Sequence, residues 1–137
     1  MSLILDSSVA LAWLFSDEAT PAILALFDQV IVRGAMVPSL WQIEIANSLT
    51  MAARKGRITL DERRELLIDL ATLPILTDSE TGARAWNASI KLADCHNLTL
   101  YDAVYLELAL RRGLPLATLD MDLRTAANAE GVSLLGV

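Results

Sequence analysis

The chain has 137 residues, a formal net charge of −6 and 54% apolar residues. This length favours one domain over residues 1–137, large enough to bury a core without disulfides or structural metals. No apolar run approaches the roughly 20 residues of a membrane-spanning helix, and an acid interrupts the first apolar run where a signal peptide would continue. We therefore expect a soluble, cytoplasmic protein without membrane association.

Cys95 and His96 are the only cysteine and histidine. With one residue of each type, the sequence has no internal disulfide, CxxC pair, HExxH motif or multi-histidine zinc site. A Cys95–His96 nucleophilic pair is conceivable, but adjacent helical residues point apart, and a buried or helix-end role is simpler. The negative net charge opposes non-specific nucleic-acid binding, although basic residues at 54–64 and 111–112 are either solvated helix ends or a local phosphate-facing rim.

Five short apolar runs are predicted as strands, at residues 2–5, 35–37, 75–77, 116–118 and 132–135. The segments between them carry helix start and stop signals. The predicted helices cover residues 9–15, 22–32, 39–55, 59–72, 80–95, 100–112 and 120–130. Their predicted N-terminal caps are Ser7 or Ser8, Thr20, Ser39, Thr59, Asp78 or Ser79, Thr99 and Asp120. This alternation predicts an α/β fold whose parallel sheet is covered on both faces.

Four acids fall at related places in this pattern. Asp6 directly follows the first predicted strand, and Asp120 follows the fourth. Glu44 lies about one turn into the helix after the second strand, and Asp102 lies in the first turn of the helix that leads into the fourth. In a parallel sheet the functional crevice lies at the carboxyl ends of the strands, where the strand order reverses. If strands one and four are neighbours, the four acids converge there.

Converging carboxylates need a positive charge, because like charges at close range cannot all stay ionised. Mg²⁺ or Mn²⁺ prefers such oxygen ligands and keeps several waters. Water polarised by the metal attacks phosphodiesters. The sequence therefore favours metal-dependent hydrolysis, with Asp6, Glu44, Asp102 and Asp120 as catalytic and metal-binding residues.

Capping is the competing interpretation for each aspartate taken alone. Glu44 is not a cap, because it sits in an apolar stretch that includes Leu40, Trp41, Ile43, Ile45 and Leu49. Asp122, two residues after Asp120, faces either the same crevice or solvent. Three polar residues are supporting candidates with structural alternatives as turn residues or a backbone-bonded amide: Ser8, Asn47 and Thr118.

Three segments together resemble the PIN-domain ribonucleases, and within them the VapC-type toxins of toxin–antitoxin pairs. They read LILDSSVALAWL, VPSLWQIEIANSLTMAARKGRI and LTLYDAVYLELALRRGLPLATLDMDLRTAA, in the family's order and spacing. The resemblance implies a three-layer α/β/α sandwich with strand order 3-2-1-4-5. It also implies Mg²⁺ or Mn²⁺ held by Asp6, Glu44, Asp102 and Asp120. Asp122 matches a further acid of some members, and Ser8, Asn47 and Thr118 match supporting polar positions.

The same resemblance implies a homodimeric endoribonuclease that cleaves tRNA or rRNA and is blocked by a cognate VapB-type antitoxin. Three alternatives stay open. A PIN-domain nuclease could act in RNA maturation or decay without an antitoxin, and a catalytically inactive relative would serve as a binding or dimerisation module. A metal-dependent phosphatase of another fold would prefer small phosphoesters to RNA.

Overall fold

The computed structural model describes residues 2–137, and five parallel strands form its central sheet. The strand order is β3-β2-β1-β4-β5, which confirms the predicted order. The strands are β1 (Ile4–Leu5), β2 (Ala35–Val37), β3 (Ile75–Thr77), β4 (Leu116–Ala117) and β5 (Leu134–Leu135). β1, β4 and β5 are shorter than predicted, and Thr118 follows β4 because its hydroxyl turns toward Asp6.

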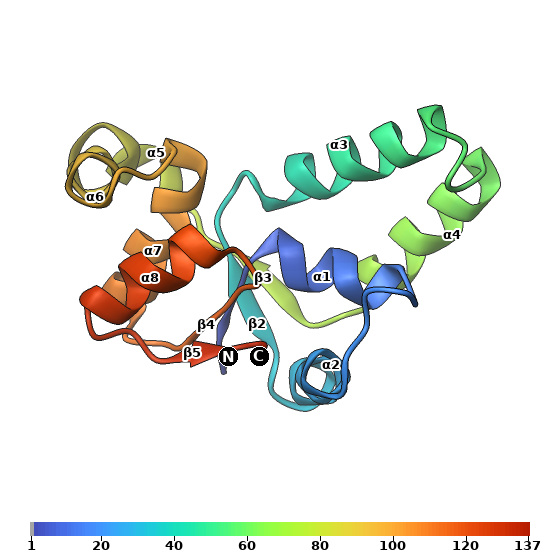
Figure 1. Cartoon of the computed structure of the whole chain (residues 1–137), viewed down its shortest axis with the longest axis horizontal. Helices are drawn as coiled ribbons and strands as arrows, with labels where there is room; N and C mark the ends of the chain where they lie inside the picture. The colour runs from blue at the N-terminus through green and yellow to red at the C-terminus, as the bar shows by residue number, and fades with distance from the viewer. Residues whose placement is uncertain (1) are drawn as a thin grey trace.

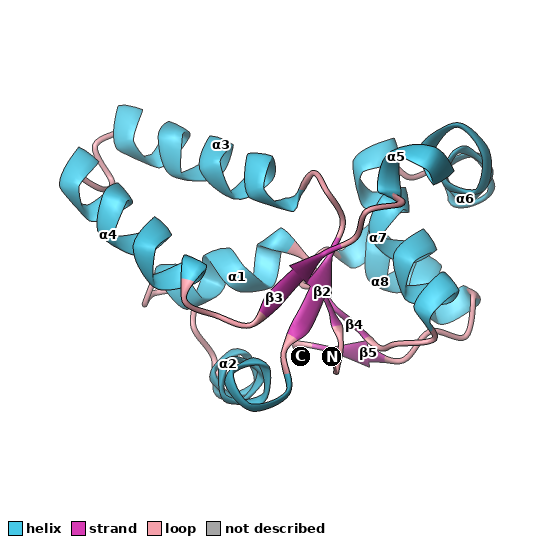
Figure 2. Ribbon diagram, turned by 180° about the vertical axis from the view of Figure 1, so that it is seen from behind, coloured by secondary structure: helices cyan, strands magenta, loops and turns pink. Residues whose placement is uncertain are grey.

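Helices cover the sheet on both sides (Figures 1 and 2). One side carries α1 (Ser7–Leu14), α2 (Pro21–Arg33), α3 (Trp41–Arg54) and α4 (Leu60–Ala71), with α3 and α4 forming a hairpin. The other side carries α5 (Thr81–Arg84), the π-helical turn η1 (Ala85–Ser89), α6 (Ile90–His96), α7 (Leu100–Arg112) and α8 (Met121–Ala129). Among the described helices, none combines the length and apolar character that crossing a membrane requires.

The central strands are buried from both sides, as the predicted parallel sheet requires. Ile4 and Leu5 of β1 are completely buried, and so are Leu116 and Ala117 of the neighbouring β4. Covered faces explain why these strands read as continuous apolar runs without polar alternation. The first polar side chains after each of these two strands therefore emerge together at the carboxyl edge of the sheet.

Local capping signals start four of the helices as predicted. The side chains of Thr20, Thr99 and Asp120 accept backbone N–H groups at the starts of α2, α7 and α8. Thr59 and Glu62 form a complete capping box at the start of α4. In each case the oxygen satisfies a backbone donor that the helix itself leaves unpaired.

Three predicted caps are wrong. α1 starts at Ser7 after Asp6, and Ser8 donates to Asp6 without capping the helix. α3 starts at Trp41 with Leu40 at the N-cap position and without a side-chain cap. The Ser39 N–H donates to Thr81, and the Gln42 amide donates to Thr77. Glu80, in place of Asp78 or Ser79, precedes α5, and the predicted helix 80–95 is interrupted by η1.

A buried ion network explains why Asp78 does not cap α5. Arg111 of α7 forms a two-pronged pair with the Asp78 carboxylate, at 3.1 and 2.7 Å, and its Nε donates to Glu107. Thr81 donates to Asp78 and accepts the Ser39 N–H, so the network joins the loops after β2 and β3 to α7. Although burial opposes ionisation, the bonds from Arg111 and Thr81 hold the pKa of Asp78 below its usual value.

We expect Arg111→Ala to destabilise the fold by about 3–5 kcal/mol, because it leaves the buried Asp78 carboxylate without its cation. The corresponding fall in Tm is roughly 10–15 °C for a chain of this length. Thermal and urea unfolding measure both quantities. Arg112→Ala is the matched control, since Arg112 is exposed in the same helix turn and loses only about 0.3–1 kcal/mol of helix-dipole interaction. Equal stability losses in the two variants would contradict the assignment.

Candidate metal-dependent active site

Asp6 forms the centre of the candidate site, at the carboxyl end of β1. Its side chain is almost completely buried, and its Oδ2 accepts the hydroxyl protons of Ser8 at 2.6 Å and Thr118 at 2.7 Å. Ser8 in turn accepts the Leu119 N–H at 3.0 Å. Because Ser8 follows β1 and Thr118 follows β4, Asp6 joins the two strands at the point where the sheet reverses its order.

Asp120 reaches the same edge from β4. Its N–H donates to Thr118 Oγ1 at 3.0 Å, which fixes the turn between the strand and α8. Its Oδ1 accepts the Leu123 N–H at 2.8 Å, so Asp120 does cap α8. It also repels Asp6 and Asp102 electrostatically, so it belongs to the acidic cluster as well. Capping and membership of the cluster are therefore compatible.

Glu44 and Asp102 approach from opposite helical layers. Asp102 lies in the first turn of α7, where its N–H donates to Thr99 at 3.2 Å. Glu44 lies in the first turn of α3 and accepts a short hydrogen bond from the phenol of Tyr105. Figure 1 shows that α3 and α7 flank the sheet on its two sides, with the carboxyl edge between them. Both acids therefore border the crevice that the sequence predicts.

Burial and repulsion between carboxylates raise the pKa values of Asp6, Glu44 and Asp102. Burial raises the pKa of Asp6, hydrogen bonds from Ser8 and Thr118 act in the opposite direction, and repulsion from Asp120 adds to the increase. Burial likewise raises the pKa of Glu44, with Tyr105 acting against it. Burial, followed by repulsion from Asp120 and Asp6, raises the pKa of Asp102 to about 6. The four acids thus share an uncompensated negative field.

Within residues 2–137, no lysine or arginine forms an ion pair with any of these four acids. Nor do any three carboxylate, imidazole or thiol groups in that range converge closely enough to form a ready-made metal site. A Mg²⁺-type ion takes one or two direct carboxylate ligands and fills its remaining positions with water, so it does not require three converging carboxylates. The donor set is entirely oxygen, as such an ion requires.

The remaining candidates are more peripheral. Asp122 is exposed near the start of α8, although its charge contributes to the raised pKa of Asp102. Asn47 is exposed on α3 and has no hydrogen bond to the four acids among the described residues. The apolar stretch around Glu44 is also less continuous than predicted, because Ile43 is 72% exposed. Ser8 and Thr118 are therefore the supporting residues with direct contacts to an acid.

Tyr105 is a residue of the candidate site that the sequence analysis did not identify. It is completely buried in α7, one turn after Asp102, and its hydroxyl contacts Glu44 from the other layer. Burial and the nearby Asp6 and Glu44 charges raise the pKa of its phenol, so it remains a proton donor. The sequence feature that could have indicated this role is a tyrosine at a core-facing position of α7, since a buried tyrosine hydroxyl usually needs a hydrogen-bond partner.

The alternative chemical groups do not assemble a second catalytic centre. Cys95 is exposed, and the His96 ring contacts Glu130 at 3.1 Å instead of the cysteine. Arg111, of the basic pair 111–112, forms hydrogen bonds with Asp78 and Glu107. In the other basic group, Arg57 pairs with Asp17 and stacks on Phe15.

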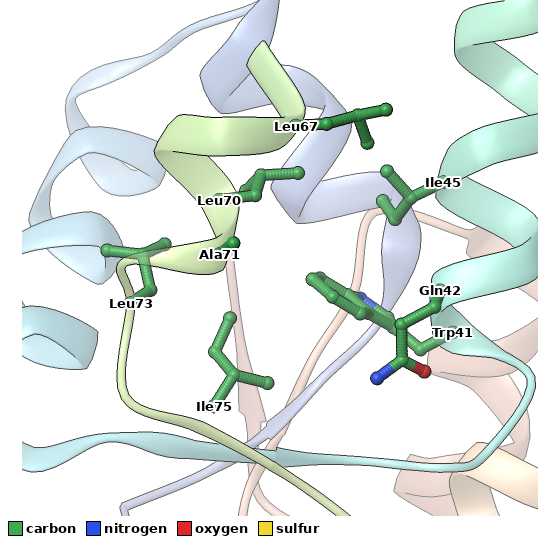
Figure 3. Close-up of a pocket in the computed structure, with 8 residues that line it drawn as sticks. All are labelled: Trp41, Gln42, Ile45, Leu67, Leu70, Ala71, Leu73 and Ile75. Carbon is green, nitrogen blue, oxygen red and sulfur yellow. The ribbon is translucent and has the colours of Figure 1, made fainter. Parts of the chain in front are cut away.

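A separate pocket lies between α3, α4 and β3 (Figure 3). Its lining residues are apolar side chains and one amide, and they comprise Trp41, Gln42, Ile45, Leu67, Leu70, Ala71, Leu73 and Ile75. None of these side chains is titratable in the physiological range, so the pocket lacks groups for acid–base or metal-assisted chemistry. The acidic cluster is the better candidate for catalysis.

A family model described as PIN domain matches residues 3–129. The chain belongs to the PIN-domain family. This PIN domain is 35% identical to Ribonuclease VapC3 of Pyrobaculum aerophilum over 80 residues, which are 58% of this chain and 61% of that protein. The chain thus matches less than two thirds of this curated relative. The relative's name nevertheless agrees with the predicted resemblance to VapC-type proteins.

Solved structures share the fold of this PIN domain. PAE2754 from Pyrobaculum aerophilum is 26% identical, with a TM-score of 0.70 over 98% of this chain and 83% of that one. FitAcB from Neisseria gonorrhoeae is 17% identical, with a TM-score of 0.68 over 98% and 96%. VapBC2 from Rickettsia felis, solved bound to a DNA fragment from its promoter, is 12% identical, with a TM-score of 0.67 over 100% and 99%.

We expect Asp102→Asn to stabilise the metal-free protein at neutral pH. With a native pKa of about 6 and an ordinary unfolded value near 3.9, the native state binds more protons than the unfolded state between about pH 4 and pH 6. The Asp102 contribution to stability is therefore lost as pH rises through that window. After allowance for solvent screening, the variant should gain about 1 kcal/mol above about pH 7.

Urea unfolding with a chelator present, across this pH range, measures the difference between the variant and the wild type. Asp94→Asn is the control, because Asp94 is exposed on α6 and undergoes the same change of charge. A stability difference that does not change with pH, or an equal gain in the control, would count against the raised pKa.

Proposed function

We propose that this protein is a metal-dependent endoribonuclease and the toxin of a VapBC-type toxin–antitoxin pair. The observation that carries the proposal is the cluster of Asp6, Glu44, Asp102 and Asp120, which lacks a basic partner in the part of the chain that the structure describes. Membership of the PIN-domain family and the likeness to Ribonuclease VapC3 support RNA as the substrate.

The proposed reaction is hydrolysis of an RNA phosphodiester by water held among the four carboxylates. Bound Mg²⁺ or Mn²⁺ supplies positive charge that polarises the scissile phosphate and makes water more acidic. Asp6, Asp102 and Asp120 are the proposed direct or water-mediated holders of the ion, with Glu44 completing the set from α3. Ser8 and Thr118 orient Asp6 by donating to its Oδ2.

Asp122 and Asn47 have smaller roles in this proposal than the four acids. Asp122 adds negative charge near Asp102 and is the outermost proposed metal contact. Asn47 is exposed on α3 and is proposed to contact substrate or metal-held water. Neither makes a hydrogen bond to the four acids within the described residues, so we expect weaker effects from their removal than from loss of Asp6 or Asp102.

The proposed partners are a VapB-type antitoxin and a second copy of the chain. Several similar structures carry toxin–antitoxin names, VapBC2 from Rickettsia felis among them, and an antitoxin would block the crevice that RNA enters. The RNA is proposed to belong to the tRNA or rRNA class. Single-stranded loops are the favoured sites within such molecules, because their bases are accessible to protein side chains.

Purified wild-type protein should cleave RNA with added Mg²⁺ or Mn²⁺ and lose activity in chelator. We expect Asp6→Asn and Asp102→Asn to lower the cleavage rate by at least about 100-fold, since each removes a charge that holds the ion. Gel analysis of a structured tRNA measures the rate. Asp94→Asn should retain activity. Undiminished cleavage in the two active-site variants would refute the proposal.

A second candidate is a PIN-domain nuclease that matures or degrades RNA without an antitoxin. The same four acids would serve it, so cleavage assays do not separate the two biological roles. A short neighbouring gene whose product binds and inhibits this protein would support the toxin assignment. A catalytically inactive binding module is the third candidate. It would be supported if calorimetric titration detected no Mn²⁺ binding and the protein left RNA uncleaved.

A further inference from the structure

We infer that Tyr105 is a positioning residue that fixes Glu44 beside the crevice by donating its phenolic proton to Glu44 Oε1. The inference rests on the proposed function and concerns the same site. Its direct observation is the hydrogen bond from the Tyr105 hydroxyl to Glu44 Oε1.

The surroundings of Tyr105 indicate a purpose for the hydroxyl. The side chain is completely buried in α7, among the apolar residues of the core. Phenylalanine would fill this space equally well, so packing alone does not require the oxygen. A buried tyrosine hydroxyl needs a partner, and here the partner is a carboxylate of the candidate site. The packed ring therefore holds a proton donor at a fixed place beside Glu44.

The Glu44 side chain needs such a restraint. It is only partly buried, it lies in the first turn of α3, and the repulsion of Asp6 and Asp102 pushes its charge away from the cluster. A flexible glutamate under that repulsion would turn toward solvent. The charge-assisted bond from Tyr105 opposes this movement, since bonds to ionised acceptors are stronger than neutral ones.

The bond also links the two helical layers. Glu44 belongs to α3 and Tyr105 to α7, which lie on opposite sides of the sheet (Figures 1 and 2). Asp102 lies three residues before Tyr105, so it projects from the same face of α7. The Tyr105 hydroxyl, together with the Ser7 side chain that also bonds to Glu44, thus sets the position of a carboxylate in one layer relative to a carboxylate in the other.

The test compares wild type, Tyr105→Phe, Glu44→Gln and the double variant. Calorimetric titration with Mn²⁺ gives the affinity, and cleavage of a structured tRNA gives kcat and KM. We expect Tyr105→Phe to weaken Mn²⁺ binding and to lower kcat by about 10–100-fold each, the effect typical of a lost outer hydrogen-bond partner, with KM changed less than about threefold. In the Glu44→Gln background the same substitution should add less than about threefold, because its effect passes through the carboxylate.

Tyr101→Phe is the matched control, because it removes a phenolic oxygen from the exposed start of the same helix. It should leave Mn²⁺ affinity and kcat unchanged. Wild-type affinity and kcat in Tyr105→Phe would overturn the inference. So would equal losses in both Glu44 backgrounds, which would indicate a general packing role. Absence of RNA cleavage by the wild type would defeat the proposed function, while the Mn²⁺ titrations would still decide the role of Tyr105.

A measurement on folded wild-type protein covers the case in which Tyr105→Phe does not fold. The buried hydroxyl proton should give a slowly exchanging, downfield proton resonance, assigned to Tyr105 by its coupling to the ring. Glu44→Ala should shift or remove this resonance, because the acceptor is lost. A resonance that is absent from the wild type, or unshifted in Glu44→Ala, would overturn the inference.

Discussion

A carboxylate buried between two strands cannot stay charged without donors, and Asp6 obtains its donors from both strands that it joins. Ser8 follows β1, Thr118 follows β4, and each hydroxyl gives its proton to the same oxygen. The adjacency of β1 and β4 is therefore a structural condition for Asp6 as well as a topological fact. The turn into α8, and with it Asp120, is fixed by the other contacts of these two hydroxyls.

Two groups of acids in the described residues differ in whether their carboxylates pair with a basic side chain. Asp78, Glu80 and Glu107 surround Arg111, so each of these acids has a cationic partner and the loops after β2 and β3 are joined to α7. The acids at the end of β1 and β4 share no such cation within residues 2–137, and burial with repulsion raises the pKa of Asp102 to about 6. The first arrangement stabilises the fold. The second keeps a negative crevice that is costly without a cation, as expected for a site that binds a metal.

The sequence was most informative where one local pattern decided the outcome. The apolar runs that predicted the five strands, the Thr59–Glu62 capping box and the Thr20–Pro21 start depend on nearby residues only, and all are present. The strand order came from the family resemblance, and it brings Asp6 and Asp120 to one edge. Ser39 lies one residue before the Leu40 N-cap position, and its N–H bonds to Thr81, 42 positions away, a contact that no local pattern predicts. The role of Tyr105 was hidden for the same reason, since its partner is 61 positions distant. Metal binding, RNA cleavage and the partners stay predictions.

The π-helical turn Ala85–Ser89 affects how many residues a homologue can carry in this segment. A π turn accommodates one residue more than an α turn, so it stores an insertion without shifting the helical segments on either side. Here it separates α5, which adjoins the Arg111 network, from α6, which packs against α7. A homologue with one residue fewer in this segment could therefore form an uninterrupted α-helix and keep both contacts. An alignment gap placed at 85–89 would mark a change in helical winding, with the carboxyl edge of the sheet unaffected.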